Sequence, residues 1–144
     1  MLCQYIDMVC IYCGKKTQVV NSRNQKKLNQ TWRRRKCPSC KNVFSTIERI
    51  NLASSLVIKN RTNKIEGFQR EKLFLSIYES LGHRKNPIED SAAITDTVVS
   101  NLLERIKSPL IERSDLIKTC LVVIKNFDKT GAVHYAAYHP VIRS

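Results

Sequence analysis

Apolar and polar positions follow different patterns in the two parts of the chain, and the pattern changes near residue 51. The first 50 residues contain few long apolar runs and no helical periodicity longer than a turn. After them come two short strand-like runs, 56–59 and 64–68, separated by the polar, turn-forming residues 60–63. The pattern predicts a β-hairpin followed by a mainly helical region.

Helical periodicity predicts two shorter helices in that region. Residues 69–81 carry an apolar stripe at positions i, i+4 and i+8, formed by Leu73, Ile77 and Leu81. Gly82 follows the stripe and is expected to be the C-cap. A last short helix is expected over 130–138. Such stripes indicate ordinary core packing.

Two longer helices are expected between these. One covers about 88–106, with acidic residues in its first turn, with Pro109 after it, and with apolar positions at Ala92, Val99, Leu102, Leu103 and Ile106. The other is expected to begin at the N-cap Ser114. Its predicted buried positions are Leu116, Cys120, Val123, Ile124 and Phe127.

Four of the six cysteines form two Cys-x-x-Cys pairs, Cys10 with Cys13 and Cys37 with Cys40. Two such knuckles can direct four thiolates at one metal ion, and Zn²⁺ fits because it takes four sulfur ligands in a closed structural site. A redox-active pair is the less favoured alternative. About fifty residues cannot bury enough apolar surface to fold unaided, so one zinc ion per chain is expected to stabilise this unit. The other two thiols are expected not to be ligands: Cys3 and Cys120.

Charge favours a polyanionic partner for this protein. The chain has 25 Lys and Arg against 12 Asp and Glu, which gives a formal net charge of +13. Residues 1–50 hold 11 basic and 2 acidic residues, whereas 51–144 hold 14 and 10. A membrane-spanning stretch and a signal-peptide pattern are both absent from the sequence, so we expect a cytoplasmic protein with no membrane partner.

A run of four cations precedes the second cysteine pair, namely Arg33, Arg34, Arg35 and Lys36. We expect the run to lie on a strand of the zinc unit, where alternation divides side chains between two faces. Trp32 offers a packing anchor or a stacking surface, and Arg23 and Lys15 are candidates to extend the patch. Arginine's planar donor fork suits phosphate oxygens and guanine edges. We favour nucleic-acid binding over a merely solvated face.

The predicted hairpin also gathers positive charge. Lys59 and Arg61 lie near its turn, and Arg70 and Lys72 lie in the first turn of the helix that follows. Phosphates could bind there with help from the free N–H groups of the helix terminus. The residues alone leave a solvated hairpin equally possible, and the sequence has no Walker-type glycine loop.

Three segments carry a resemblance to a known family that extends over nearly the whole chain: CIYCGKKTQVVNSR, WRRRKCPSCKNVFSTIER and VIKNRTNKIEGFQREKL. In that order they resemble the zinc ribbon, the arginine run and the ATP-cone of the NrdR family, which are bacterial transcriptional repressors of ribonucleotide reductase genes. The resemblance implies an α+β protein with two domains. Residues 1–48 would form a DNA-binding zinc ribbon, and 49–144 a mainly helical ATP-cone with an N-terminal β-hairpin.

The same resemblance implies a function that is not enzymatic. The ribbon would bind double-stranded promoter DNA of ribonucleotide reductase operons. The cone would bind ATP and dATP, which would control homo-oligomer formation and DNA affinity. Its nucleotide residues would be Val57, Lys59, Arg61 and Lys72, with Glu66 and Phe68 close by.

Departures from the family pattern leave some roles and some alternatives open. The turn NRTN is one residue longer than usual, so either Asn60 or Arg61 could fill the basic turn position. The leader before the first cysteine pair is longer, and the acidic tail expected after the closing helix is absent. The alternative functions are a regulatory subunit of a nucleotide-metabolism enzyme and a zinc-ribbon adaptor that binds nucleic acid without nucleotide control.

Overall fold

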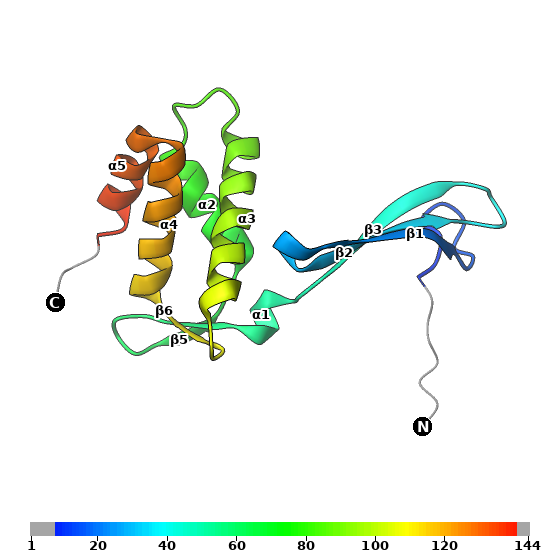
Figure 1. Cartoon of the computed structure of the whole chain (residues 1–144), viewed down its shortest axis with the longest axis horizontal. Coiled ribbons are helices and arrows are strands. Elements are labelled where there is room, and N and C mark those ends of the chain that lie inside the picture. The colour runs from blue at the N-terminus through cyan, green and yellow to red at the C-terminus, as the bar shows by residue number, and fades with distance from the viewer. Residues whose placement is uncertain (1–7, 141–144) are drawn as a thin grey trace. The chain divides into compact units, whose positions relative to one another are not determined.

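The computed structural model describes residues 8–140. The chain divides into two compact units, Met1–Ile50 and Asn51–Ser144. As expected, the first unit contains strands and the second is mostly helical, which makes the protein α+β (Figure 1). The first unit also holds a cluster of four cysteines.

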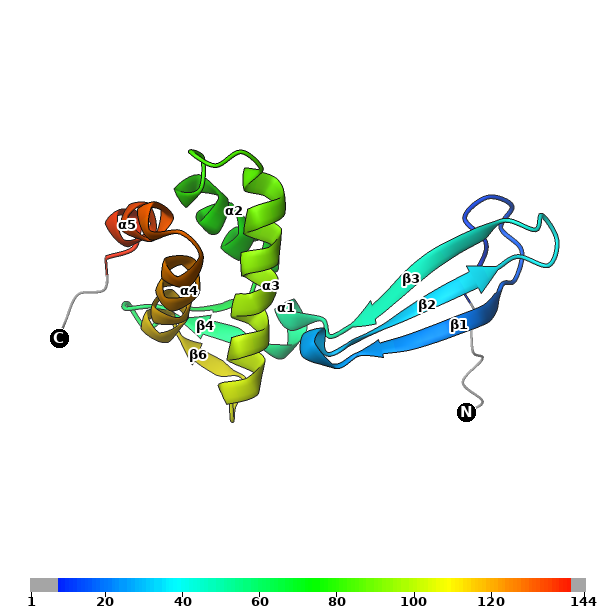
Figure 2. The same cartoon turned by 45° about the horizontal axis from the view of Figure 1, so that its top comes forward.

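The first unit is an antiparallel sheet of three strands. Strands β1 (Gln18–Gln25), β2 (Gln30–Lys36) and β3 (Val43–Arg49) pair in sequence order, and the short 3₁₀ turn η1 (Lys26–Leu28) joins the first two (Figure 2). Arg33 stands opposite Ser22 on β1 and Thr46 on β3. A register shift interrupts β1 between Val19 and Asn21.

The first unit has almost no apolar core. Among residues 8–50 the buried side chains are those of Cys10, Thr17 and Cys37. Two of these three are the first cysteines of the two knuckles. The sheet alone therefore buries too little apolar surface to account for a stable fold.

The second unit contains a three-stranded sheet of order β5-β4-β6. After the short helix α1 (Leu52–Ser55), β4 (Val57–Lys59) and β5 (Ile65–Gly67) form the predicted antiparallel hairpin. The sequence pattern did not reveal β6 (Leu110–Glu112), which pairs with β4 in parallel. Parallel partners are distant in sequence, so neither strand carries a local turn signal for the other.

Helices α2 (Arg70–Ser80), α3 (Pro87–Arg105), α4 (Arg113–Phe127) and α5 (Lys129–Tyr138) correspond to the four that periodicity predicts. Two expected caps are wrong. The backbone of Gly82 does not take positive φ, and Leu81 caps α2 instead. Ser114 lies inside α4, whose N-cap is Glu112 because β6 runs directly into the helix.

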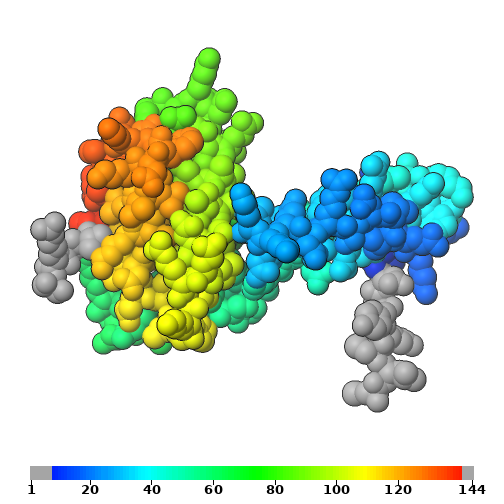
Figure 3. Space-filling model, viewed as in Figure 1, coloured from blue at the N-terminus to red at the C-terminus, as the bar shows by residue number. Residues whose placement is uncertain are grey.

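The core of the second unit lies between its helices and its sheet. The predicted stripe of α2 is buried as expected, and Ile58 contributes from the centre of the sheet. The predicted burial of Phe127 is wrong, since its side chain is 45% exposed. Ile94, Val98 and Ile117 are buried although they were not predicted, because α3 and α4 each pack against more than one neighbour. Figure 3 shows the outer surfaces of α3 and α4 on the viewed face of this unit.

Candidate metal centre and nucleic-acid interface

The two Cys-x-x-Cys segments fold into equivalent knuckles. The N–H of Cys10 donates to the carbonyl of Lys15 at 2.8 Å, and that of Cys37 donates to the carbonyl of Asn42 at 2.9 Å. The residue after the second cysteine of each knuckle has a left-handed backbone conformation, Gly14 with φ +70° and Lys41 with φ +64°. Glycine takes this conformation without steric cost, whereas a lysine does so under strain.

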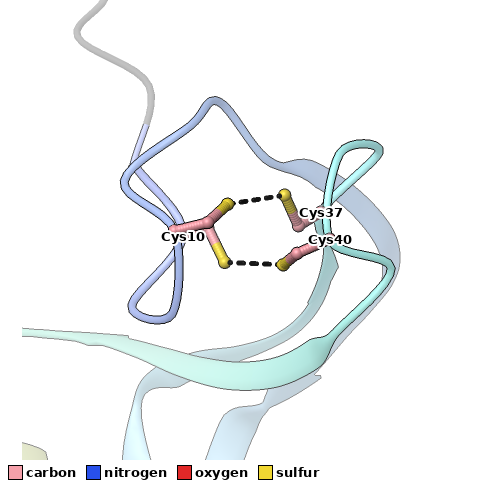
Figure 4. A group of neighbouring side chains, drawn as sticks. Cys10, Cys37 and Cys40 are labelled. Atoms are coloured by element: carbon pink, nitrogen blue, oxygen red, sulfur yellow. Dashed lines mark hydrogen bonds between the residues drawn. The ribbon is translucent and has the colours of Figure 1, made fainter.

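The knuckles place four sulfur atoms around one point (Figure 4). The Sγ atoms of Cys10 and Cys40 are 3.6 Å apart, those of Cys13 and Cys37 are 3.5 Å apart, and all four lie within 4.8 Å of one another. A tetrahedral ion with zinc–sulfur bonds of about 2.3 Å separates its ligands by about 3.8 Å. The donor set therefore fits a structural Zn²⁺, as the spacing predicts.

The ionisation of the cysteines also fits a bound cation. The backbone N–H of Asn42 is the main cause that lowers the pKa of Cys40 to about 6. For Cys13 the N–H of Lys15 lowers the pKa, but burial and the neighbouring sulfurs outweigh it and raise the pKa to about 11. Four thiolates this close repel one another, so a divalent cation is needed to hold all four deprotonated.

One face of the three-stranded sheet, here called the tryptophan face, consists of Arg23, Trp32, Arg34, Lys36 and Ile47. Alternation along β2 puts Trp32, Arg34 and Lys36 on the same side. Arg23 and Ile47 pair with Trp32 from the two flanking strands. The guanidinium of Arg23 lies over the Trp32 ring at 5.9 Å from its centroid. Arg49, which sequence reasoning missed, falls on this side by alternation from Ile47.

The opposite face holds the other two arginines of the run. Arg33 forms an ion pair with Glu48 at 2.9 Å. Arg35 donates hydrogen bonds to the hydroxyls of Thr46 at 3.3 Å and Thr17 at 3.4 Å. The run is divided between the two faces, as alternation along a strand predicts: Arg33 and Arg35 are held by neighbouring side chains, while Arg34 and Lys36 lie exposed on the tryptophan face.

The hairpin residues of the second unit lie in two groups. Lys59 and Arg61 line a cavity of about 370 Å³ together with residues from α4 and the end of α5. Lys72 instead pairs with Glu66 at 3.1 Å where β5 meets α2. Val57 is half-buried and shares the Lys59 side of β4, opposite the buried Ile58.

The remaining cysteine predictions have two outcomes. Cys120 is fully buried on α4 and is not one of the four clustered cysteines, while Cys3 is outside the described residues. Across residues 8–140, none of the helices is both long enough and apolar enough to cross a membrane.

These features define a zinc-ribbon protein with a second, mostly helical α+β unit. Residues 8–48 match the family model for the N-terminal domain of "transcriptional repressor NrdR-like" proteins. Relatives named "Transcriptional repressor NrdR" are 35% identical in Rhizobium etli (strain CIAT 652), over 92% of this chain and 83% of the relative, and 31% identical in Dictyoglomus turgidum, over 92% and 87%. A third, from Rhodospirillum centenum, is 34% identical over 94% and 88%. The chain belongs to the NrdR family of transcriptional repressors, as the resemblance implied. These relatives carry the name of a repressor, not of an enzyme.

Proposed function

We propose that this protein is a nucleotide-sensing repressor that binds promoter DNA of ribonucleotide reductase operons through its zinc ribbon. ATP and dATP bind the helical unit and control both the oligomeric state and the affinity for DNA. The observation that carries the proposal is the tryptophan face, a rigid basic surface on a zinc-ribbon sheet of the NrdR family.

The tryptophan face has the charge and shape expected for a DNA contact. It bears Arg23, Arg34, Lys36 and Arg49, and no Asp or Glu occurs at the strand positions on this side. Arg34 and Lys36 have no acidic partner among the ion pairs of the described residues. Unpaired cations can meet phosphates and guanine edges without first breaking an ion pair. Arg33 and Arg35 lie on the opposite face of the sheet, where they add to the positive electrostatic potential of the ribbon.

Nucleotide binding is assigned to Val57, Lys59, Arg61, Glu66 and Lys72. The cavity beside Lys59 and Arg61 supports this assignment, since both side chains can donate charge-assisted hydrogen bonds to phosphate. Asn60 uses its side-chain oxygen within the turn, accepting from the N–H groups of Thr62 and Lys64, both at 3.0 Å. We therefore assign the basic turn position to Arg61.

The small size of one ribbon supports a function as an oligomer. A three-stranded sheet of about 30 residues offers little contact area, so several ribbons acting together give the affinity that one lacks. Twofold symmetry between protomers would match inverted repeats in the operator. dATP lacks the 2′-OH of ATP, and a coupling of about 1–3 kcal/mol between nucleotide and DNA sites would change DNA occupancy several-fold or more.

The test is binding of a labelled promoter fragment from a ribonucleotide reductase operon by the zinc-loaded full chain at fixed salt. Wild-type protein is compared with Arg34→Ala and with Arg33→Ala, alone, with ATP, and with dATP plus ATP. Arg34→Ala should weaken binding by about tenfold, because it loses a base or phosphate contact. Arg33→Ala should weaken it less, because Arg33 is tied to Glu48.

Two results would count against the proposal, and they concern different parts of it. If Arg34→Ala binds the promoter as tightly as wild type while retaining one zinc, the tryptophan face is not the DNA contact. If wild type binds equally in all three nucleotide conditions, the ribbon binds DNA without nucleotide control and the adaptor function applies instead.

A further inference from the structure

The cavity beside the hairpin brings together cations from three separate segments of the chain. Lys59 and Arg61 come from β4 and its turn, and Arg113 is the first residue of α4. Tyr138 and His139 from the end of α5 complete the wall. The volume of about 370 Å³ is within the range of small-ligand sites.

Acidic side chains balance this charge only in part. Lys59 lies 3.6 Å from Glu112, the acidic residue that lines the cavity. Arg61 donates to the backbone carbonyl of Pro140 at 2.6 Å, which is a neutral acceptor. Arg113 is exposed and has no acidic partner among the ion pairs of residues 8–140.

Arg113 lies at the end of α4 where a helix does not stabilise a cation. The first turn of a helix carries the positive end of the helix dipole, where acidic residues are stabilising and a cation is not. No side chain caps the N-terminus of α4, so its first N–H groups add partial positive charge. The pKa of His139, on the same cavity wall, is lowered first by burial and then by the positive charge of Arg113.

We propose that Arg113 contacts the nucleotide phosphates in the subsite that the proposed function already gives to Lys59 and Arg61. The inference rests on the proposed nucleotide binding and adds to it a residue outside the hairpin. The guanidinium fork of Arg113 offers paired donors to phosphate oxygens, and the first turn of α4, which no side chain caps, lines the same cavity. A phosphate oxygen also replaces the neutral carbonyl of Pro140 as acceptor for Arg61, which strengthens that bond.

Calorimetric titration of the zinc-loaded full chain with ATP tests the assignment. Arg113→Gln removes the cation and keeps a polar side chain. Arg105→Gln is the matched control, because Arg105 is an exposed arginine at the end of α3 that lies outside this cavity. We expect Arg113→Gln to weaken ATP binding by about tenfold or more, and Arg105→Gln to change it less than twofold. Inorganic tripolyphosphate should compete with ATP on wild type and much less on Arg113→Gln.

A second readout separates ligand contact from a structural role. Because Arg113 sits at the positive end of α4, Arg113→Gln should melt no earlier than wild type without nucleotide. An earlier melt would show that Arg113 supports the fold and would overturn the inference.

The two proposals fail in different ways. If wild type and Arg113→Gln bind ATP equally, nucleotide binding stands and the subsite assignment is wrong. If wild type does not bind ATP at all, both are wrong.

Discussion

Zinc removal should unfold the ribbon and leave the helical unit folded. In the ribbon the buried side chains of the described residues are those of Cys10, Thr17 and Cys37, so two of the three are metal ligands. The helical unit, residues 51–144, has its own core, to which the described residues contribute fifteen buried side chains. Each fully buried aliphatic or aromatic side chain contributes about 1.5–3 kcal/mol, so this core is sufficient without a metal.

The magnitude decides the outcome for the ribbon. Structural zinc contributes about 10–16 kcal/mol of apparent binding free energy in small zinc domains. Typical domains are stable by only about 5–15 kcal/mol, so losing the metal removes as much as a whole domain's net stability. Chelation also leaves four sulfurs within 4.8 Å with no cation between them.

The assay is a two-dimensional amide NMR spectrum recorded before and after chelation. Dispersed peaks from residues 8–50 should collapse to random-coil positions, and those from 51–140 should stay. Cys37→Ser should reproduce the collapse and lose the zinc. Cys120→Ala should keep one zinc per chain, because Cys120 lies outside the cluster. A ribbon that keeps its dispersed peaks after chelation would refute the reasoning.

Two further predictions concern local backbone and charge. Substitutions at the two knuckle residues with positive φ should have opposite effects on zinc affinity, measured by competition with a chelator. Gly14→Lys should weaken zinc binding, because a side chain at this φ adds about 1–2 kcal/mol of strain. Lys41→Gly should leave zinc binding equal or tighter, because it removes such strain. Asp128→Ala should lower the free energy of unfolding of the helical unit by about 1–2 kcal/mol in urea at pH 7, since Asp128 caps α5 by accepting from the N–H of Gly131 at 2.8 Å. The N–H of Gly131 and then Arg84 hold the pKa of the Asp128 carboxyl well below its usual range. The stabilisation from Asp128 is therefore present above about pH 4 and is lost as the pH falls further. Equal stabilities of wild type and Asp128→Ala at pH 7 would contradict this.

Features that depend on neighbouring positions were determined by the sequence itself. The spacing of Cys10, Cys13, Cys37 and Cys40 was enough to predict a four-sulfur centre, because each knuckle needs only a short loop to aim two thiolates. The hairpin and the stripe of α2 follow from periods of 2 and 3.6 residues, which any local window reveals. The predicted helix boundaries were close to the observed ones. The predicted caps at Gly82 and Ser114 were wrong, because adjoining segments determine where a helix begins and ends.

Only the tertiary structure decided which side chains share a surface. Alternation predicted that the run from Arg33 to Lys36 is divided between two faces, but only pairing with both flanking strands leaves Arg34 and Lys36 exposed beside Trp32 and engages Arg33 and Arg35 on the other face. Likewise Arg113 and His139 reach the hairpin cavity only because β6 pairs with β4 in parallel and α5 packs back on α4. Long-range pairing and packing have no local period, so the sequence alone could supply these residues but not bring them together.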